Sequence, residues 1–94
     1  MECERIFFSG HAVRRMFERG LTVPEISHVL ENGEPIAEYP HDVPFASTLV
    51  LGYVGGSPLH VVVARDEHSG TCYVVTAYPP DPALWSDDFK TRRE

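Results

Sequence analysis

The chain has 94 residues, a formal net charge of −6 and 43% hydrophobic residues. These values are typical of one globular domain, and no apolar run reaches the ~20 residues needed to span a bilayer. We therefore expect a single domain over residues 1–94, with a core at about 6–79 and a tail at 80–94. The first residues are acidic and mixed rather than basic and then apolar, which favours a cytoplasmic location. The acidic charge argues against nonspecific binding to nucleic acid.

The charge is unevenly distributed along the chain. Residues 5–19 contain four arginines and one glutamate, whereas residues 25–42 contain five acidic residues and no lysine or arginine. A local basic surface can therefore coexist with an acidic whole. The two cysteines, Cys3 and Cys72, show no Cys-x-x-Cys spacing, so we expect free, buried thiols rather than a zinc site or a disulfide framework.

The pattern from Ser9 to Gly20 predicts a capped amphipathic helix, preceded by a short edge strand at 5–8. Ser9 is a good N-cap, and Gly20 suits the left-handed position that ends a helix. At about 100° per residue, the two faces of this helix separate cleanly. The apolar face holds Ala12, Val13, Met16 and Phe17, and the polar face holds His11, Arg14, Arg15, Glu18 and Arg19.

A second helix is predicted from Thr22 to Asn32. Thr22 and Glu25 have the spacing of a capping box, and Gly33 follows as a stop signal. Beyond Gly33 the hydrophobic period changes to about two, which predicts strands. We expect these at 36–39, 47–54, 58–65 and 71–78.

Gly55 and Gly56 form the strongest hairpin signal, because both can adopt the positive φ of a type I′ turn. This turn places Val54 opposite Ser57 and Leu51 opposite His60. The strands are apolar on both sides, so we expect both faces of the sheet to be covered. Prolines in the tail end strand pairing, and we expect apolar tail residues to pack on the core: Leu84, Trp85 and Phe89.

Two clusters of polar residues are candidates for chemistry. His11, Arg15 and Arg19 recur every four residues along one border of the first helix. Such a stripe can bind phosphate through guanidinium groups and supply an acid or base through the imidazole. The alternative is an ordinary solvated helix face.

The second cluster lies on the strands. If residues 66–70 form a five-residue turn, Arg65 pairs with Thr71, His60 lies opposite Thr76, and Tyr78 shares their face. A one-residue change of register would separate His60 from the other two. The alternative is a set of buried, hydrogen-bonded polar residues.

Metal and serine-hydrolase chemistry have weaker support. The five histidines show no helical ligand spacing, and no Gly-x-Ser-x-Gly motif is present. We therefore expect no metal and no cofactor.

The ordered set of motifs resembles an uncharacterised family of short bacterial and archaeal proteins related to the RelE and BrnT toxins. The matching pieces are His11-x3-Arg15-Met16-x2-Arg19-Gly20, the helix opening at Thr22, the strand Leu59 to Val63, and the strand end Val75 to Pro79. The resemblance implies a RelE-like α+β fold, with two N-terminal helices on one face of an antiparallel sheet of about three to five strands. It also implies an antitoxin protein as partner.

Members of this superfamily with known activity are metal-independent ribonucleases, so the resemblance implies an endoribonuclease that cleaves RNA by attack of the 2′-hydroxyl. It leaves open which of His11 and His60 is the acid and which the base. The alternative is a noncatalytic protein-binding module of the same fold. The residues expected at the site are His11, Arg15, His60 and Tyr78 as catalytic groups, and Arg14, Arg19 and Thr76 as substrate-binding groups.

Overall fold

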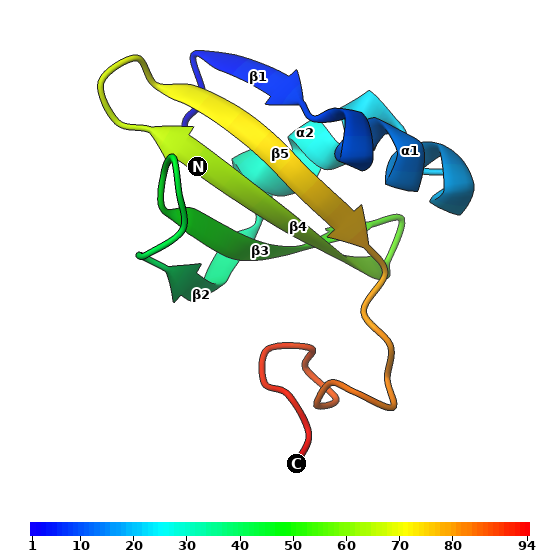
Figure 1. The fold of residues 1–94 in the computed structure, drawn as a ribbon. Coiled ribbons are helices and arrows are strands. Elements are labelled where there is room, and N and C mark those ends of the chain that lie inside the picture. The colour runs from blue at the N-terminus through cyan, green and yellow to red at the C-terminus, as the bar shows by residue number, and fades with distance from the viewer.

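The computed structural model describes residues 1–94 as two helices and a five-stranded sheet, so the fold is α+β (Figure 1). The sheet order is β1-β5-β4-β3-β2. Neither helix has the length and apolar character that crossing a bilayer requires. In chain order the elements are β1 (Arg5–Phe8), α1 (Gly10–Arg19), α2 (Val23–Asn32), β2 (Glu34–Tyr39), β3 (Ser47–Val54), β4 (Ser57–Asp66) and β5 (Thr71–Tyr78).

The helix caps form as the sequence predicts. The Ser9 side chain accepts a hydrogen bond from the Ala12 amide, and Gly20 ends α1 with φ of 66°. Thr22 and Glu25 complete both halves of the capping box at the start of α2. Each cap satisfies amides that have no partner within the first helical turn, which fixes where the helix begins.

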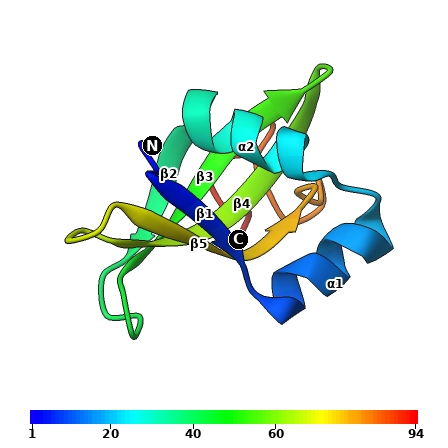
Figure 2. The same cartoon turned by 90° about the horizontal axis from the view of Figure 1, so that it is seen from above.

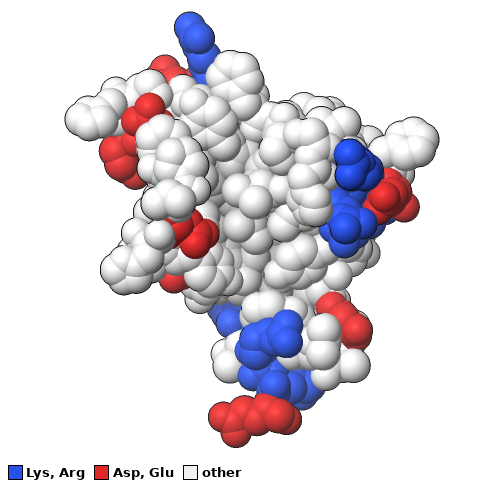
Figure 3. Space-filling model, viewed as in Figure 1, with Lys and Arg blue, Asp and Glu red and all other residues white.

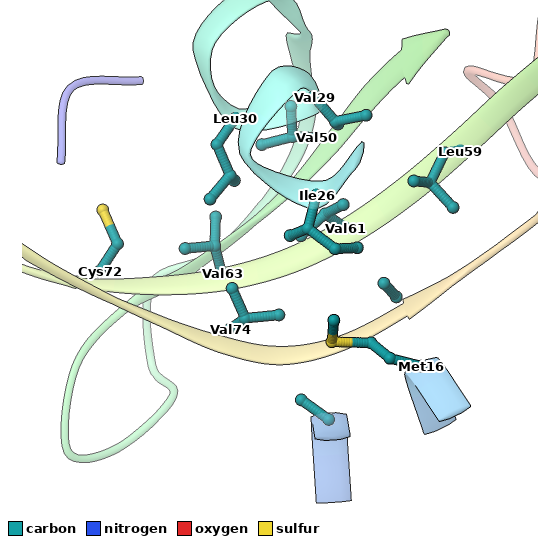
Figure 4. Close-up of a cluster of buried hydrophobic side chains, with 12 residues drawn as sticks. Met16, Ile26, Val29, Leu30, Val50, Leu59, Val61, Val63, Cys72 and Val74 are labelled. Atoms are coloured by element: carbon teal, nitrogen blue, oxygen red, sulfur yellow. The ribbon is translucent and has the colours of Figure 1, made fainter. Parts of the chain in front are cut away.

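Both helices pack on the same face of the sheet, because they share one hydrophobic core with β3, β4 and β5 (Figure 4). α2 lies over β3 and β4, and α1 lies beside the end of β5 (Figure 2). Gly52 allows the close approach of α2, since a Cβ there would lie 2.9 Å from both methyl groups of Val29. The core residues are Ala12, Met16, Ile26, Val29, Leu30, Val50, Leu59, Val61, Val63, Cys72, Val74 and Ala77.

The sheet is mixed, so the expectation of a purely antiparallel sheet was wrong. β1 is the predicted edge strand, but it pairs parallel with β5, with Arg5 opposite Thr71. The other neighbours pair antiparallel. Parallel neighbours need a long connection, and here α1, α2 and three strands separate the two partners along the chain. Four residues of strand pattern contain no information about that direction.

The pairing of β1 with β5 also corrects the expectation for the cysteines. Ile6 lies opposite Cys72, and Cys3 lies just before the residues of β1 that pair with β5. Cys3 and Cys72 form a disulfide with a Cα–Cα distance of 5.6 Å. The sequence separation of 69 residues hides this proximity. The expectation of two free thiols was therefore wrong, because strand pairing rather than local spacing brings the cysteines together.

The hairpin of β3 and β4 has the predicted register. Val54 pairs with Ser57 and Leu51 with His60, and both turn glycines have positive φ, 57° and 83°. The register of β4 with β5 differs from the prediction. Asp66, not Arg65, pairs with Thr71, and a bulge then shifts the pairing by a further residue.

The bulge preserves the predicted grouping of polar residues while changing the partners. Val63 pairs with Val74 and Val62 with Thr76, so Val75 is the extra residue. His60 therefore lies opposite Tyr78 rather than opposite Thr76. Because the total displacement is two residues, all three polar side chains still share one face.

The face of the sheet opposite the helices is only partly covered. The tail packs Trp85 over it, as predicted, whereas Leu84 stays exposed. At the other end of this face, Phe45 from the loop after β2 stacks on Tyr73, with ring centroids 5.7 Å apart. The tail and the loop after β2 therefore cover parts of this face, and no helix packs on it.

Candidate functional site

The candidate site lies on the helix-free face, where His60 and Tyr78 are neighbours across β4 and β5. The His60 side chain is fully buried, with 0% exposed. Its ring lies 4.5 Å from the Trp85 ring and 5.3 Å from the Tyr78 ring, edge to face in both cases. The tail and two strands together therefore enclose this imidazole.

Hydrogen bonding assigns the neutral tautomer of His60. Nε2 lies 2.8 Å from the carbonyl oxygen of Phe89, which can only accept, so Nε2 carries the proton and donates. Nδ1 is then the acceptor and receives a weak hydrogen bond from the Tyr78 hydroxyl at 3.4 Å. Burial lowers the pKa of His60, and the bond to the Phe89 carbonyl opposes this shift. The imidazole is therefore a neutral acceptor toward Tyr78 at neutral pH.

Tyr78 remains protonated at neutral pH. Burial is the largest cause that raises its pKa, and the nearby Tyr39 raises it further. The positive charges of Arg92 and Arg19 lower it by smaller amounts. Its hydroxyl is therefore a hydrogen-bond and proton donor that lies within the field of two arginines.

Arg19 reaches this site from the end of α1. Its Nη1 donates to the carbonyl oxygen of Ala77 at 2.7 Å, the residue directly before Tyr78. This bond links the last turn of α1 to the end of β5. One member of the predicted helix stripe therefore belongs to the strand cluster.

The other members of the stripe do not join the cluster. Arg15 forms an exposed ion pair with Glu18 at 2.9 Å. His11 and Arg14 are exposed and make no side-chain hydrogen bond or ion pair, and no contact of either kind links His11 to His60 or Tyr78. Because His11 precedes Arg19 by two helical turns, it lies roughly 12 Å farther along the helix axis.

Thr76 is half-buried on the same face as Tyr78, two residues earlier along β5, and pairs with Val62. The structure thus groups four of the seven predicted site residues, namely His60, Thr76, Tyr78 and Arg19. It leaves His11, Arg14 and Arg15 on the surface of α1.

Three tail residues complete the surroundings of the site, and they were not among the predicted site residues. Trp85 covers His60, Phe89 accepts its Nε2 hydrogen bond, and the Arg92 guanidinium lies 5.6 Å from the Trp85 ring centroid. The sequence signal was the apolar pair Trp85 and Phe89 in a proline-rich tail, which predicted docking but not its position. Arg92 gave no separate signal.

A further cavity lies away from this cluster. A cavity of about 650 Å³ on the same face lies between the loop after β2 and the start of β5, lined by His41, Asp42, Val43, Pro44, Phe45, Ser47, Ala64, Tyr73 and Val75. None of the predicted site residues lines it. No group of three or more histidine, cysteine, aspartate or glutamate side chains is arranged to hold a metal ion.

Comparison with known proteins identifies a family without an assigned activity. No curated protein and no solved structure is significantly similar to the chain. The family described as a domain of unknown function, DUF4258, matches residues 8–79, which contain both helices, strands β2 to β5 and all seven predicted site residues. The chain therefore belongs to the DUF4258 family.

Proposed function

We propose that this domain is a RelE-like, metal-independent endoribonuclease of a toxin–antitoxin system that cleaves RNA by attack of the 2′-hydroxyl. The observation that carries the proposal is the contact between neutral His60 and protonated Tyr78 beside Arg19. Cleavage of a phosphodiester requires a proton donor, a proton acceptor and a positive charge near the phosphate, and this cluster offers one group of each kind.

In this proposal each group has a distinct role. Tyr78 donates its proton to the leaving 5′ oxygen, because its raised pKa keeps the hydroxyl protonated. Arg19 stabilises the negative charge that develops on the phosphate, and Thr76 binds the substrate beside Tyr78. His60 orients the Tyr78 hydroxyl through Nδ1. One of the two histidines, His60 or His11, takes the proton of the 2′-hydroxyl.

The test is cleavage of a single-stranded RNA by the purified protein in EDTA, with detection of 2′,3′-cyclic phosphate ends. Tyr78→Phe should lower the cleavage rate about 100-fold or more, since general acid catalysis contributes about 10²- to 10⁴-fold. Tyr53→Phe is the matched control, because Tyr53 is an exposed tyrosine on β3 and should keep the wild-type rate. No cleavage by the wild type, or equal rates for Tyr78→Phe and Tyr53→Phe, would contradict the proposal.

Two further variants assign the base. His11→Ala removes an exposed side chain without other contacts, so its effect on the fold should be small. If His11→Ala cleaves normally and His60→Gln does not, His60 is the base and acts through Tyr78. The Tyr78 oxygen then takes the 2′-hydroxyl proton as Tyr78 passes its own proton to Nδ1, and the proton returns by the same route to the leaving 5′ oxygen. If His11→Ala loses cleavage, the helix stripe takes part directly.

A noncatalytic binding module is the second candidate, and the exposed apolar face of α1 favours it. Phe17 is 88% exposed and Val13 53% exposed, although both lie on the apolar face of the helix that the sequence predicted. Ala12 and Met16 are the only buried residues of α1, because this helix packs mainly on β5, at the edge of the core. In this candidate function Phe17 and Val13 bind an antitoxin-like protein.

The binding candidate makes a separable prediction. Phe17→Ser should abolish co-purification with a co-expressed antitoxin-like protein, and neither the wild type nor the variant should cleave RNA. A cytoplasmic toxin would hold Cys3 and Cys72 as thiols, because disulfides are rare in that reducing compartment. We propose a cytoplasmic location together with this function, and it predicts that the Cys3–Cys72 disulfide is reduced in the cell.

A further inference from the structure

Four of the eight basic side chains have no acidic partner. Arg15, Arg65, Lys90 and Arg93 form ion pairs, and Arg5, Arg14, Arg19 and Arg92 form none. The chain has 14 acidic residues, so these four guanidinium groups lack a partner although carboxylates outnumber basic groups. Two of the four, Arg19 and Arg92, come from opposite ends of the sequence, and contacts lead from each of them to Tyr78. Arg19 bonds the carbonyl of the residue before Tyr78, and Arg92 lies over Trp85, which packs with Tyr78 around the His60 ring.

Arg19 is held in place by the main chain. Its Nη1 donates to the Ala77 carbonyl, which leaves the rest of the guanidinium fork without a partner. A guanidinium has five N–H donors, so most of its hydrogen-bonding capacity is unused. Because the anchoring bond is to the residue before Tyr78, the free donors remain near the Tyr78 side chain.

Arg92 is held in place by an aromatic ring. Its guanidinium lies over the Trp85 ring, and a backbone bridge also links the two residues. Trp85 is itself buried against His60. The residue that covers the imidazole therefore also positions Arg92.

The neighbouring acidic groups of the tail are occupied elsewhere. Asp87 pairs with Arg93 at 2.7 Å, and Asp88 accepts hydrogen bonds from the Ser86 hydroxyl and the Lys90 amide. On the face seen in Figure 3, basic side chains appear at the right, beside α1 and the end of β5, and again on the tail below. The tail carboxylates Asp87 and Asp88 therefore leave Arg92 without an acidic partner.

The two guanidinium groups offer hydrogen-bond donors and no acceptor, and the Tyr78 hydroxyl adds a donor when it turns away from its weak bond to Nδ1 of His60. An oxyanion is the ligand that satisfies such a set, and a phosphate matches the fork geometry of arginine. We propose that Arg92, together with Arg19 and Tyr78, forms a binding site for a phosphodiester of single-stranded RNA, and that the tail is a wall of this site rather than a cover over it. The choice of RNA as the source of the phosphate rests on the proposed function.

The experiment measures binding without cleavage, using a short 2′-O-methyl RNA oligonucleotide that lacks the attacking hydroxyl. Arg92→Gln should weaken binding about tenfold, in the range expected for the loss of one charged contact. The slope of log K against log salt concentration should become shallower by about one. Arg93→Gln is the matched control, because Arg93 is the next residue and is already paired with Asp87. It should bind within about twofold of the wild type.

A second variant separates charge from tail docking. Arg92→Lys keeps the charge but not the fork, so it should restore part of the affinity. Trp85 is the only tryptophan, so its fluorescence reports whether the tail stays docked. Equal losses in Arg92→Gln and Arg92→Lys, with a shifted Trp85 emission, would mean that the tail has detached, and would overturn the site.

The remaining outcomes distinguish this inference from the proposed function. The inference is overturned if the wild type does not bind the oligonucleotide, or if Arg92→Gln binds it as tightly as the wild type or more tightly. Tighter binding by Arg92→Gln would identify the tail as a cover. Binding that depends on Arg92, with no cleavage of ordinary RNA by the wild type, supports the site and rejects the ribonuclease. Cleavage that does not change in Arg92→Gln supports the ribonuclease and rejects a role for Arg92.

Discussion

At the scale of single residues, burial sets the protonation state of His60. A charged imidazole would lose its hydration beneath Trp85 and gain only one carbonyl acceptor in exchange. The neutral ring instead donates from Nε2 and accepts at Nδ1, so both nitrogens are satisfied. The same contacts that stabilise the fold therefore keep this residue available as an acceptor toward Tyr78.

This arrangement predicts that acid destabilises the protein through His60. Its pKa is lowered in the folded state, so the unfolded chain binds more protons between the folded pKa and the usual pKa of 6.5. The free energy of unfolding should therefore fall as the pH drops from about 7 through this window, as measured by urea denaturation at several pH values.

The variant His60→Gln should flatten this pH dependence while lowering stability at pH 7. His11→Gln is the control, because His11 is exposed and should leave the slope unchanged. A slope that is the same in the wild type and in His60→Gln would show that another group causes the acid response.

Single residues also show how far the sequence could predict the site. Strand alternation placed His60, Thr76 and Tyr78 on one face, because side-chain direction has a period of two. It could not predict that Tyr78, rather than Thr76, is the partner of His60, because the bulge at Val75 has no local signature. Arg92 was missed because its position depends on where a tail without regular structure docks.

At the scale of elements, α2 is the main support of the sheet. Its three buried residues, Ile26, Val29 and Leu30, fill the centre of the core shared with β3 and β4 (Figure 4). α1 contributes only Ala12 and Met16 as buried residues. The two helices therefore differ in what they contribute, with α2 stabilising the fold and α1 presenting side chains at the surface.

We predict a large difference in stability between substitutions on the two helices. Ile26→Ala removes a fully buried side chain and should lower the free energy of unfolding by about 2–5 kcal/mol. Val13→Ala, at a half-exposed position of α1, should change it by about 0.5 kcal/mol or less. Thermal and urea denaturation of both variants would measure this, and equal losses would show that α1 is as deeply packed as α2.

Element boundaries were predicted more accurately than element direction. Caps, glycine turns and hydrophobic period are local, so both helices and the hairpin at Gly55 and Gly56 lie where the sequence indicated. The parallel pairing of β1 with β5 depends on contacts between segments more than 60 residues apart along the chain. No local pattern records such a contact.

At the scale of the whole molecule, the disulfide ties the segment before β1 to β5, the strand that lies beside β1 in the sheet. Cys3 and Cys72 close a loop with a sequence separation of 69 residues. In the chain-entropy account, a cross-link over a loop of this size stabilises the folded state by about 4 kcal/mol, by restricting the unfolded chain.

We therefore expect Cys3→Ser, or reduction of the wild type, to lower the free energy of unfolding by up to about 4 kcal/mol. The reduced wild type and Cys3→Ser without reducing agent should have the same stability, since both lack the cross-link. A reducing agent that leaves the wild-type denaturation midpoint unchanged would show that the bond contributes little to stability or does not form in solution.

The cross-link also determines what a protease can release. The exposed loop after β2, which contains His41 and Val43, lies between Cys3 and Cys72 in the chain. A single cut there leaves two fragments that remain covalently joined, so they migrate as one species on a nonreducing gel and separate only after reduction. A cut in the tail after Pro80 lies outside the closed loop and frees the segment carrying Trp85 and Arg92 at once. The oxidised protein thus has one region where cleavage preserves the covalent unit and one where cleavage removes Arg92, one of the two guanidinium groups of the proposed phosphate site.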